Sequence, residues 1–224
     1  MTSAHITTVV VDYGGVLTNP LNETFAAFAT AVGVPLTDLQ DAFARATARH
    51  GRSPMADLET GRCTESEMVE RVLAELPGGR GRDLLGGRDF GELWFRARTV
   101  NEEMVAFVRS LRQDGYRTAL LTNNVAEWGP RWRAQLPVDE LFDVVVDSSA
   151  EGVRKPDPEI YRRLLERLPA APHECMFVDD LEENCSTASD LGMFAVPFIT
   201  TDEAIDLIVA VLRSHGGYRV RKPV

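Results

Sequence analysis

Short runs of apolar, mostly β-branched residues recur along the chain, and each run stops at polar residues, glycine or proline. The first run, residues 6–11, ends at Asp12 and is followed closely by two glycines. Short, continuous apolar runs bounded in this way are typical of strands buried on both faces of a parallel sheet. Four later runs have the same character and predict strands over residues 117–121, 142–146, 174–178 and 193–196.

Helical periodicity fills the segments between these strands. Residues 101–114 carry apolar side chains three and four positions apart, and Gly115 ends the pattern as a typical helix-terminating residue. The same period predicts helices over residues 158–168, 181–191 and 202–213. Strands that alternate with helices indicate an α/β fold with a doubly wound parallel sheet, that is, a Rossmann-like core.

Residues 20–98 differ from the rest of the chain because they contain no strand-like run. Their periodicity predicts a wholly helical unit inserted after the first strand. We therefore expect an α/β core formed by residues 1–19 and 99–224, and an all-helical unit formed by residues 20–98. Within that unit we expect helices over residues 21–32, 36–50, 64–76 and 90–98, and a glycine- and arginine-rich loop over residues 77–88.

Composition and charge exclude several classes of protein. The formal net charge of −10 argues against a surface that binds nucleic acid or an anionic membrane, because both need basic residues. No apolar run approaches the length of a membrane span, and residues 1–10 lack the pattern of a signal peptide. The three cysteines form no CxxC motif and suggest reduced thiols. We expect a cytoplasmic protein with neither a nucleic acid nor a membrane as partner.

Polar side chains stand where the predicted strands end. Asp12 follows the first strand, Thr122 follows the second, and the acidic pair at residues 179–180 follows the fourth, while Lys155 lies in a loop between strands. Ligands of open α/β sheets bind at the carboxyl ends of the strands, so these groups can converge. Carboxylates suit Mg²⁺, and lysine and threonine suit the oxygens of a phosphoryl group.

These strand ends form four motifs in chain order: Asp12-Tyr13-Gly14-Gly15-Val16, Leu121-Thr122-Asn123, Arg154-Lys155-Pro156-Asp157-Pro158 and Val178-Asp179-Asp180-Leu181. Together they resemble the motifs of the haloacid dehalogenase-like hydrolase superfamily, whose members are mostly Mg²⁺-dependent phosphatases. The resemblance extends from residue 6 to about residue 197, and the helical insert falls where many members carry a cap domain.

The resemblance implies a nucleophile and a metal site. Asp12 would attack phosphorus and form an aspartyl-phosphate, which divides one difficult displacement into two easier ones. Mg²⁺ would be held by Asp12, by the backbone carbonyl of Gly14 and by Asp180, and would ease the approach of one anion to another. The expected partner is a small, phosphorylated organic molecule.

The resemblance also implies the residues that bind the phosphoryl group. These are the Gly14-Gly15 turn, the Thr122 hydroxyl, the backbone of Asn123 and the Lys155 ammonium. Thr122 and Lys155 would also be catalytic, with Lys155 screening the charges of Asp12 and the phosphoryl group. Lys155 is one of only two lysines among 24 basic residues, and a compact ammonium suits this role better than a planar guanidinium.

Position 14 departs from the family pattern. The family's phosphatases usually carry a second aspartate there, which protonates the departing oxygen, whereas this chain has Gly14. Loss of such a proton donor lowers a rate by about 10²–10⁴. Three interpretations stay open: a phosphatase with a good leaving group or an acid from elsewhere, a catalytically weakened binding or regulatory protein, and a metal-independent haloacid dehalogenase. The acidic pair at residues 179–180 disfavours the third.

Acidic and aromatic residues in and near the insert have an ordinary structural interpretation. We expect the acidic residues on solvated helix faces: Glu59, Glu65 and Glu67. We expect the aromatic residues to serve in packing: Trp94, Phe95, Trp128 and Trp132.

Overall fold

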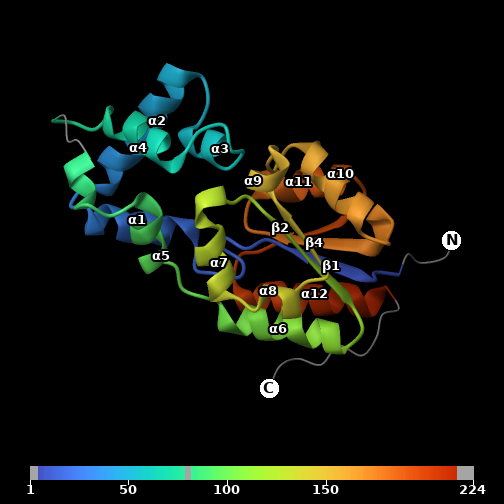
Figure 1. Cartoon of the computed structure of the whole chain (residues 1–224). Helices are drawn as coiled ribbons and strands as arrows, with labels where there is room; N and C mark the ends of the chain where they lie inside the picture. Colours follow the sequence, from blue (N-terminus) through green and yellow to red (C-terminus); the bar gives the residue numbers. More distant parts are fainter. Residues whose placement is uncertain (1–4, 79–81, 216–224) are drawn as a thin grey trace.

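A computed structural model describes residues 5–78 and 82–215 of the chain. Five parallel strands form one sheet in the order β3-β2-β1-β4-β5, so β1 lies at its centre between β2 and β4 (Figure 1). Each predicted strand is present, with its ends shifted by at most two residues. The strands are β1 (Thr8–Val11), β2 (Arg117–Thr122), β3 (Val144–Asp147), β4 (Cys175–Asp179) and β5 (Phe194–Pro197).

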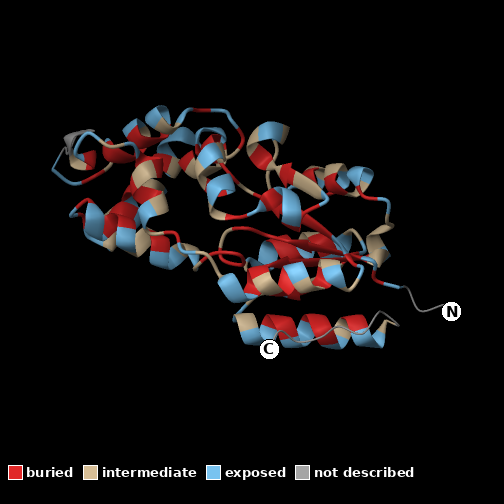
Figure 2. Ribbon diagram, turned by 60° about the horizontal axis from the view of Figure 1, so that its bottom comes forward, coloured by how far each residue is buried: buried red, intermediate tan, exposed pale blue. Residues whose placement is uncertain are grey.

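Helices cover both faces of this sheet. Alternate residues of β1 point to opposite faces, and Val9 and Val11 join one hydrophobic cluster while Val10 joins the other. Figure 2 shows the buried stripes that the helices turn toward the sheet. The doubly wound α/β fold expected from the sequence is therefore confirmed. One face carries α6 (Glu102–Gln113) and α12 (Thr201–Ser214), and the other carries α10 (Pro158–Arg167) and α11 (Glu182–Asp190).

Several short elements lie in the connections between strands, and the sequence pattern did not predict them. Each is too short for a helical period to be distinguished from a loop. They are η2 (Ala126–Trp128), α7 (Gly129–Gln135), α8 (Val138–Leu141), α9 (Ser148–Glu151) and η3 (Pro172–Glu174). Across the described ranges, no helix is both long enough and apolar enough to span a bilayer.

The inserted segment forms a helical unit with a hydrophobic core of its own. Its helices are α1 (Leu21–Ala31), α2 (Leu36–His50), α3 (Pro54–Leu58), α4 (Glu65–Leu73) and α5 (Phe90–Arg96). Helix α3 was not predicted. The expected loop over residues 77–88 contains the short helix η1 (Arg82–Leu85). Residues 79–81 of this loop lie outside the described residues, as do residues 1–4 of the N-terminal segment in which no signal-peptide pattern was found. Backbone segments entering and leaving the unit meet in a bridge between Thr18 and Val100.

Contacts with the segment after β2 hold the helical unit at the carboxyl edge of the sheet (Figure 1). Val125 and Trp128 belong to the hydrophobic core of the unit although they lie far from it in sequence. Glu65 of α4 accepts hydrogen bonds from the Trp128 indole and from the amides of Phe90 and Gly91. The expectation that Glu65 lies on a solvated face is therefore wrong: its carboxylate joins the helical unit to the core.

Candidate active site

A buried ion pair stands at the end of the central strand. Asp12 directly follows β1, and its amide donates to the Val178 carbonyl of β4, which fixes the backbone there (2.9 Å). The Lys155 Nζ lies 2.8 Å from Asp12 Oδ1 and 2.6 Å from Asp179 Oδ2, and the lysine side chain is only 1% exposed. Residues separated by more than a hundred positions in sequence thus meet at the carboxyl edge of the sheet.

Three hydrogen-bond donors hold the carboxylate of Asp179, one at Oδ2 and two at Oδ1. Its Oδ2 accepts from Lys155, and its Oδ1 accepts from the Leu181 amide (2.9 Å) and the Asn184 side chain (2.8 Å). A fully buried carboxylate is stable only when its oxygens are satisfied in this way. The sequence prediction gave a role, as a metal ligand, only to Asp180, and the structure adds Asp179 as a residue that anchors Lys155.

Asn123 positions the loop that carries Lys155. Its Oδ1 accepts from the Lys155 amide (2.8 Å) and its Nδ2 donates to the Lys155 carbonyl (3.0 Å). This pair of bonds ties the end of β2 to the lysine without using the Asn123 backbone. Thr122 is fully buried, and its hydroxyl makes only a 3.5 Å contact with the Asn123 carbonyl. Thus Asn123 lines the adjoining cavity, whereas Thr122 lies beneath the surface.

Three carboxylates gather beside this ion pair. Asp12, Asp179 and Asp180 each place an oxygen within 4.8 Å of the others. Burial raises the pKa of Asp180 to about 6, and the charge of Asp179 adds to this shift. Burial also raises the pKa of Asp12, against the opposing effect of Lys155. Burial alone lowers the pKa of Lys155, but its two carboxylate neighbours outweigh burial and raise it.

The donor set fits a divalent cation. When ionised, three carboxylates exceed the single ammonium by two negative charges, and their crowded oxygens are the hard ligands that Mg²⁺ prefers. The Gly14-Gly15 turn leaves room for this arrangement. Gly15 has a φ of 86°, and a Cβ there would lie 2.2 Å from Asp180 Oδ2. The Gly15 amide is itself engaged, donating to Thr18 Oγ1 (3.2 Å).

A cavity of about 290 Å³ opens beside Asp12, between the core and the helical unit. Asp12, Gly14, Lys155 and Asp180 form its polar floor, and aromatic side chains line much of the remainder. The sequence prediction that these aromatics serve in packing is confirmed, since Trp94 and Trp128 stack at 5.9 Å, but they also border the cavity. The aromatic lining consists of Tyr13, Phe25, Trp94, Phe95 and Trp128, whereas Trp132 is buried against Tyr13.

The places of two charged residues in the cavity wall were not predicted from the sequence. Glu59, expected on a solvated face, instead lines the cavity and forms an ion pair with Arg154 (3.1 Å). Burial raises the pKa of Glu59, and Arg154 opposes that shift. Arg98, just beyond α5, also lines the cavity and is buried. No sequence signal marks Glu59 or Arg98, because their position depends on how the helical unit lies against the core.

Fold and site define the class of the protein. A doubly wound parallel sheet carries, at its carboxyl edge, a carboxylate on the central strand together with a lysine and an acidic pair from later loops. The family model of haloacid dehalogenase-like hydrolases matches residues 6–192, and the chain belongs to this family.

Individual relatives agree with this assignment. The chain is 29% identical over 207 residues to bifunctional epoxide hydrolase 2 of Sus scrofa, a match that covers 88% of this chain but only 37% of that protein. It is 31% identical over 156 residues to phosphatase MT3486 of Mycobacterium tuberculosis (strain CDC 1551 / Oshkosh), covering 67% of this chain and 69% of that one. HAD family enzyme bt-2542 of Bacteroides thetaiotaomicron has a similar fold, with a TM-score of 0.70 at 20% identity over 91% of this chain and 98% of that chain.

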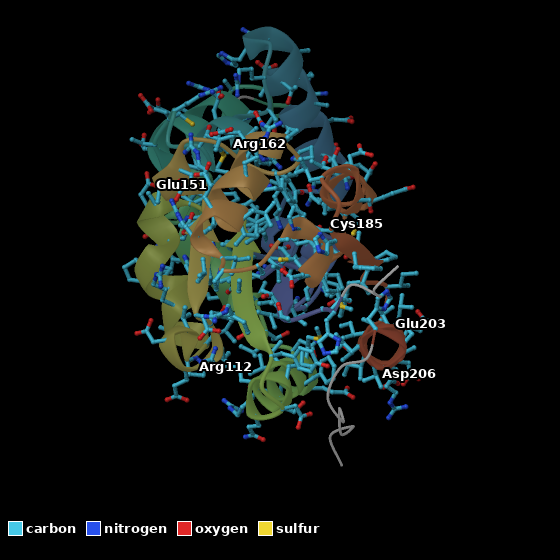
Figure 3. The ribbon with its side chains drawn as sticks, turned by 90° about the vertical axis from the view of Figure 1, so that its right-hand side faces the viewer. Arg112, Glu151, Arg162, Cys185, Glu203 and Asp206 are labelled. Carbon is cyan, nitrogen blue, oxygen red and sulfur yellow. The ribbon has the colours of Figure 1, made fainter. Side chains whose placement is uncertain are left out.

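Removal of the buried ammonium should destabilise the protein strongly. We expect Lys155→Met to lower the free energy of unfolding by about 3–5 kcal/mol, because two buried carboxylates then face each other without a cation. Chemical denaturation followed by circular dichroism measures the change. The matched control is Arg162→Met, since Arg162 lies exposed on α10 (Figure 3) and pairs with Glu159 only at the surface. Its effect should stay within about 0.5 kcal/mol. Equal losses in the two variants would contradict the structural role of Lys155.

Proposed function

We propose that the protein is a Mg²⁺-dependent phosphatase that acts on a small organic phosphate through an aspartyl-phosphate on Asp12. The observation that carries this proposal is the ion pair between Lys155 and Asp12 inside the carboxylate cluster. The pair holds one Asp12 oxygen, and Asp12, although buried, lines the cavity, which leaves a route for a substrate to approach. Residues 20–98 serve as a cap over this route.

The first step transfers the phosphoryl group to the protein. A carboxylate oxygen of Asp12 attacks phosphorus, the bond to the ester oxygen breaks, and its electron pair leaves with that oxygen. Lys155 keeps the Asp12 carboxylate in place and screens its charge. The sequence also predicts phosphoryl contacts from Thr122, the backbone of Asn123 and the Gly14-Gly15 turn, and of these residues Gly14 and Asn123 line the cavity.

The second step regenerates the carboxylate. Water attacks the phosphorus of the aspartyl-phosphate, and the bond between phosphorus and the Asp12 oxygen breaks. The products are ionised Asp12 and inorganic phosphate, which carries both hydrogens of the attacking water. Asp12, Asp180 and the Gly14 carbonyl would hold Mg²⁺, which when bound neutralises the phosphoryl oxygens. Asp179 contributes by fixing the position of Lys155.

Two comparisons support this chemistry. One relative, from Mycobacterium tuberculosis, is named a phosphatase. The Bacteroides enzyme was crystallised with magnesium and inorganic phosphate, and that structure aligns with a TM-score of 0.61 at 20% identity over 86% of this chain and 93% of that one. The aromatic wall of the cavity favours a substrate that has an apolar or ring-shaped organic part.

One alternative function rests on Gly14. Without the usual acid at this position, the same scaffold could bind a phosphorylated metabolite without turning it over. The two functions differ in one measurable property, which is the release of inorganic phosphate. Halide release from a small haloacid in the presence of a chelator would instead indicate metal-independent dehalogenation.

Substitution of the nucleophile provides the direct test. We expect the wild-type protein to hydrolyse an aryl phosphate in the presence of Mg²⁺, and Asp12→Asn to abolish this activity because an amide is a poor nucleophile. Phosphate release measured over time gives both rates. Asp206→Asn, on the exposed face of α12 (Figure 3), is the control and should retain full activity. Equal rates for Asp12→Asn and the wild type would exclude the proposed function.

The proposed metal site can be tested through Gly15. We expect Gly15→Ala to weaken Mg²⁺ binding at least tenfold, because its methyl group would displace Asp180. Isothermal titration calorimetry measures the affinity. Gly33→Ala is the matched control, since Gly33 also has a positive φ (66°) but no atom lies within 4 Å of an added Cβ. Both variants lose stability through backbone strain, so only the loss of affinity distinguishes them. Unchanged affinity in Gly15→Ala would argue against Asp180 as a ligand.

A further inference from the structure

Arg98 is a buried cation that faces the cavity beside Asp12. It is 6% exposed and lies two residues beyond α5, where the chain returns from the helical unit to the core. Its guanidinium lies 5.5 Å from the centroid of the Tyr13 ring, and its Nη1 is 3.4 Å from Thr24 Oγ1. The Tyr13 hydroxyl donates to the Gln135 side chain. Arg98 is therefore fixed by its packing next to the first motif.

The guanidinium occupies the space next to position 14. A Cβ built on Gly14 would lie 3.0 Å from Arg98 Nη2. A side chain at position 14 would thus point toward Arg98, and its tip would compete with the guanidinium for the same volume. Glycine at position 14 therefore leaves the space that the Arg98 guanidinium occupies.

Within the part of the chain that the structure describes, no carboxylate forms an ion pair with Arg98. Among the described residues, no ion pair includes Arg98, and its Nε has no hydrogen-bond partner. Asp12 and Asp180 act on it only electrostatically, from farther away. A buried guanidinium without a carboxylate is costly unless something else supplies the negative charge. The side of Arg98 that faces the cavity is where a substrate can supply that charge.

We propose that Arg98 stabilises the oxygen that departs from phosphorus, and that the enzyme therefore acts on phosphate esters of phenols or enols. This inference rests on the proposed phosphatase function and deepens it. When the bond between phosphorus and the ester oxygen breaks, the electron pair stays on that oxygen. Arg98 donates hydrogen bonds to the resulting oxyanion and transfers no proton to it. The anion takes its proton from water after it leaves the site.

The chemistry of a guanidinium sets this substrate class. Burial lowers the pKa of Arg98, yet a guanidinium stays protonated at neutral pH, so it is a poor proton donor but a lasting positive charge with several N–H groups. A phenol, like tyrosine, has a pKa of about 10, whereas the pKa values of water and of alcohols are far higher. Electrostatic stabilisation suffices for a weakly basic phenolate or enolate, whereas an alkoxide needs a proton. The aromatic cavity wall, with Phe25, Trp94, Phe95 and Trp128, fits a planar leaving group.

A series of leaving groups tests this assignment. Substituted phenyl phosphates are assayed with Mg²⁺, and kcat/KM is plotted against the pKa of the departing phenol. We expect Arg98→Gln to lower the rate about 10²–10³-fold for the most basic phenolates, as loss of one oxyanion donor does elsewhere. The loss should be much smaller for 4-nitrophenolate, so the slope of the plot becomes steeper. Arg98→Lys should restore part of the loss, because it keeps the charge but not the two-pronged geometry.

Controls separate this effect from misfolding and from failure of the proposed function. Arg96→Gln removes the same group from the exposed surface two residues away, where it pairs with Glu92, and should leave the slope unchanged. Partial unfolding lowers all rates by one factor and cannot change a slope. Parallel plots for Arg98→Gln and the wild type would overturn the role of Arg98 alone. A wild type without Mg²⁺-dependent hydrolysis would instead overturn the proposed function.

The contact between Gly14 and Arg98 yields a second arm of the test. Gly14→Asp alone would place a carboxylate against Arg98, where the ion pair keeps it ionised and unable to donate a proton. We expect little gain on an alkyl phosphate from this single variant. In the double variant Gly14→Asp with Arg98→Gln, the new carboxyl group no longer pairs with a guanidinium and can donate a proton. The rate of alkyl phosphate hydrolysis should then rise by about 10²–10⁴. Equal rates in the single and double variants would contradict the inference.

Discussion

The ammonium of Lys155, buried between Asp12 and Asp179, is the interaction on which the rest of the site depends. Two carboxylates at the ends of neighbouring strands repel each other in a medium of low dielectric constant, and removing each from water costs several kcal/mol. The Lys155 ammonium attracts both carboxylates, so the electrostatic energy of the three groups together becomes favourable. Asn123 and Asn184 then complete the arrangement, one by fixing the lysine backbone and the other by satisfying an oxygen of Asp179.

The charges around the cavity also show how an acidic protein could accept the anionic substrate that we propose. The chain has a net charge of −10, but the cavity wall carries three cations, namely Lys155, Arg154 and Arg98. Lys155 and Arg154 are each paired with a carboxylate, whereas Arg98 forms no ion pair with any residue of the described ranges. Because the helical unit lies beside these cations and limits contact with water, their fields act on a bound ligand more strongly than surface charges would. The local distribution of charge, and not the net charge, therefore governs which ligand the cavity favours.

The sequence predicted the sheet and its strand-end residues because both follow from local patterns. A buried parallel strand is apolar throughout, and parallel strands bring their carboxyl ends to one edge, so Asp12, Lys155 and Asp180 could be assigned to one site. The sequence could not predict the wall of the cavity. Glu59 follows a helix of five residues, too short to show a period, and Arg98 acquires its position only when the helical unit packs against Trp128. The separate roles of adjacent Asp179 and Asp180 depend equally on tertiary hydrogen bonds.

The pairing of Gly14 with Arg98 changes the selectivity of such a site more than its catalytic power. General acid catalysis worth about 10²–10⁴ in rate corresponds to about 2.7–5.4 kcal/mol of barrier. A single donor to a developing oxyanion contributes about 2.7–4 kcal/mol. The two devices are therefore of similar strength, but they act on different substrates. A proton donor helps most when the departing oxygen is strongly basic, whereas a fixed positive charge helps any oxyanion without neutralising it. A glycine at position 14, with a guanidinium beside it in place of a carboxylic acid, thus restricts the proposed substrates to esters whose oxygen can depart as an anion.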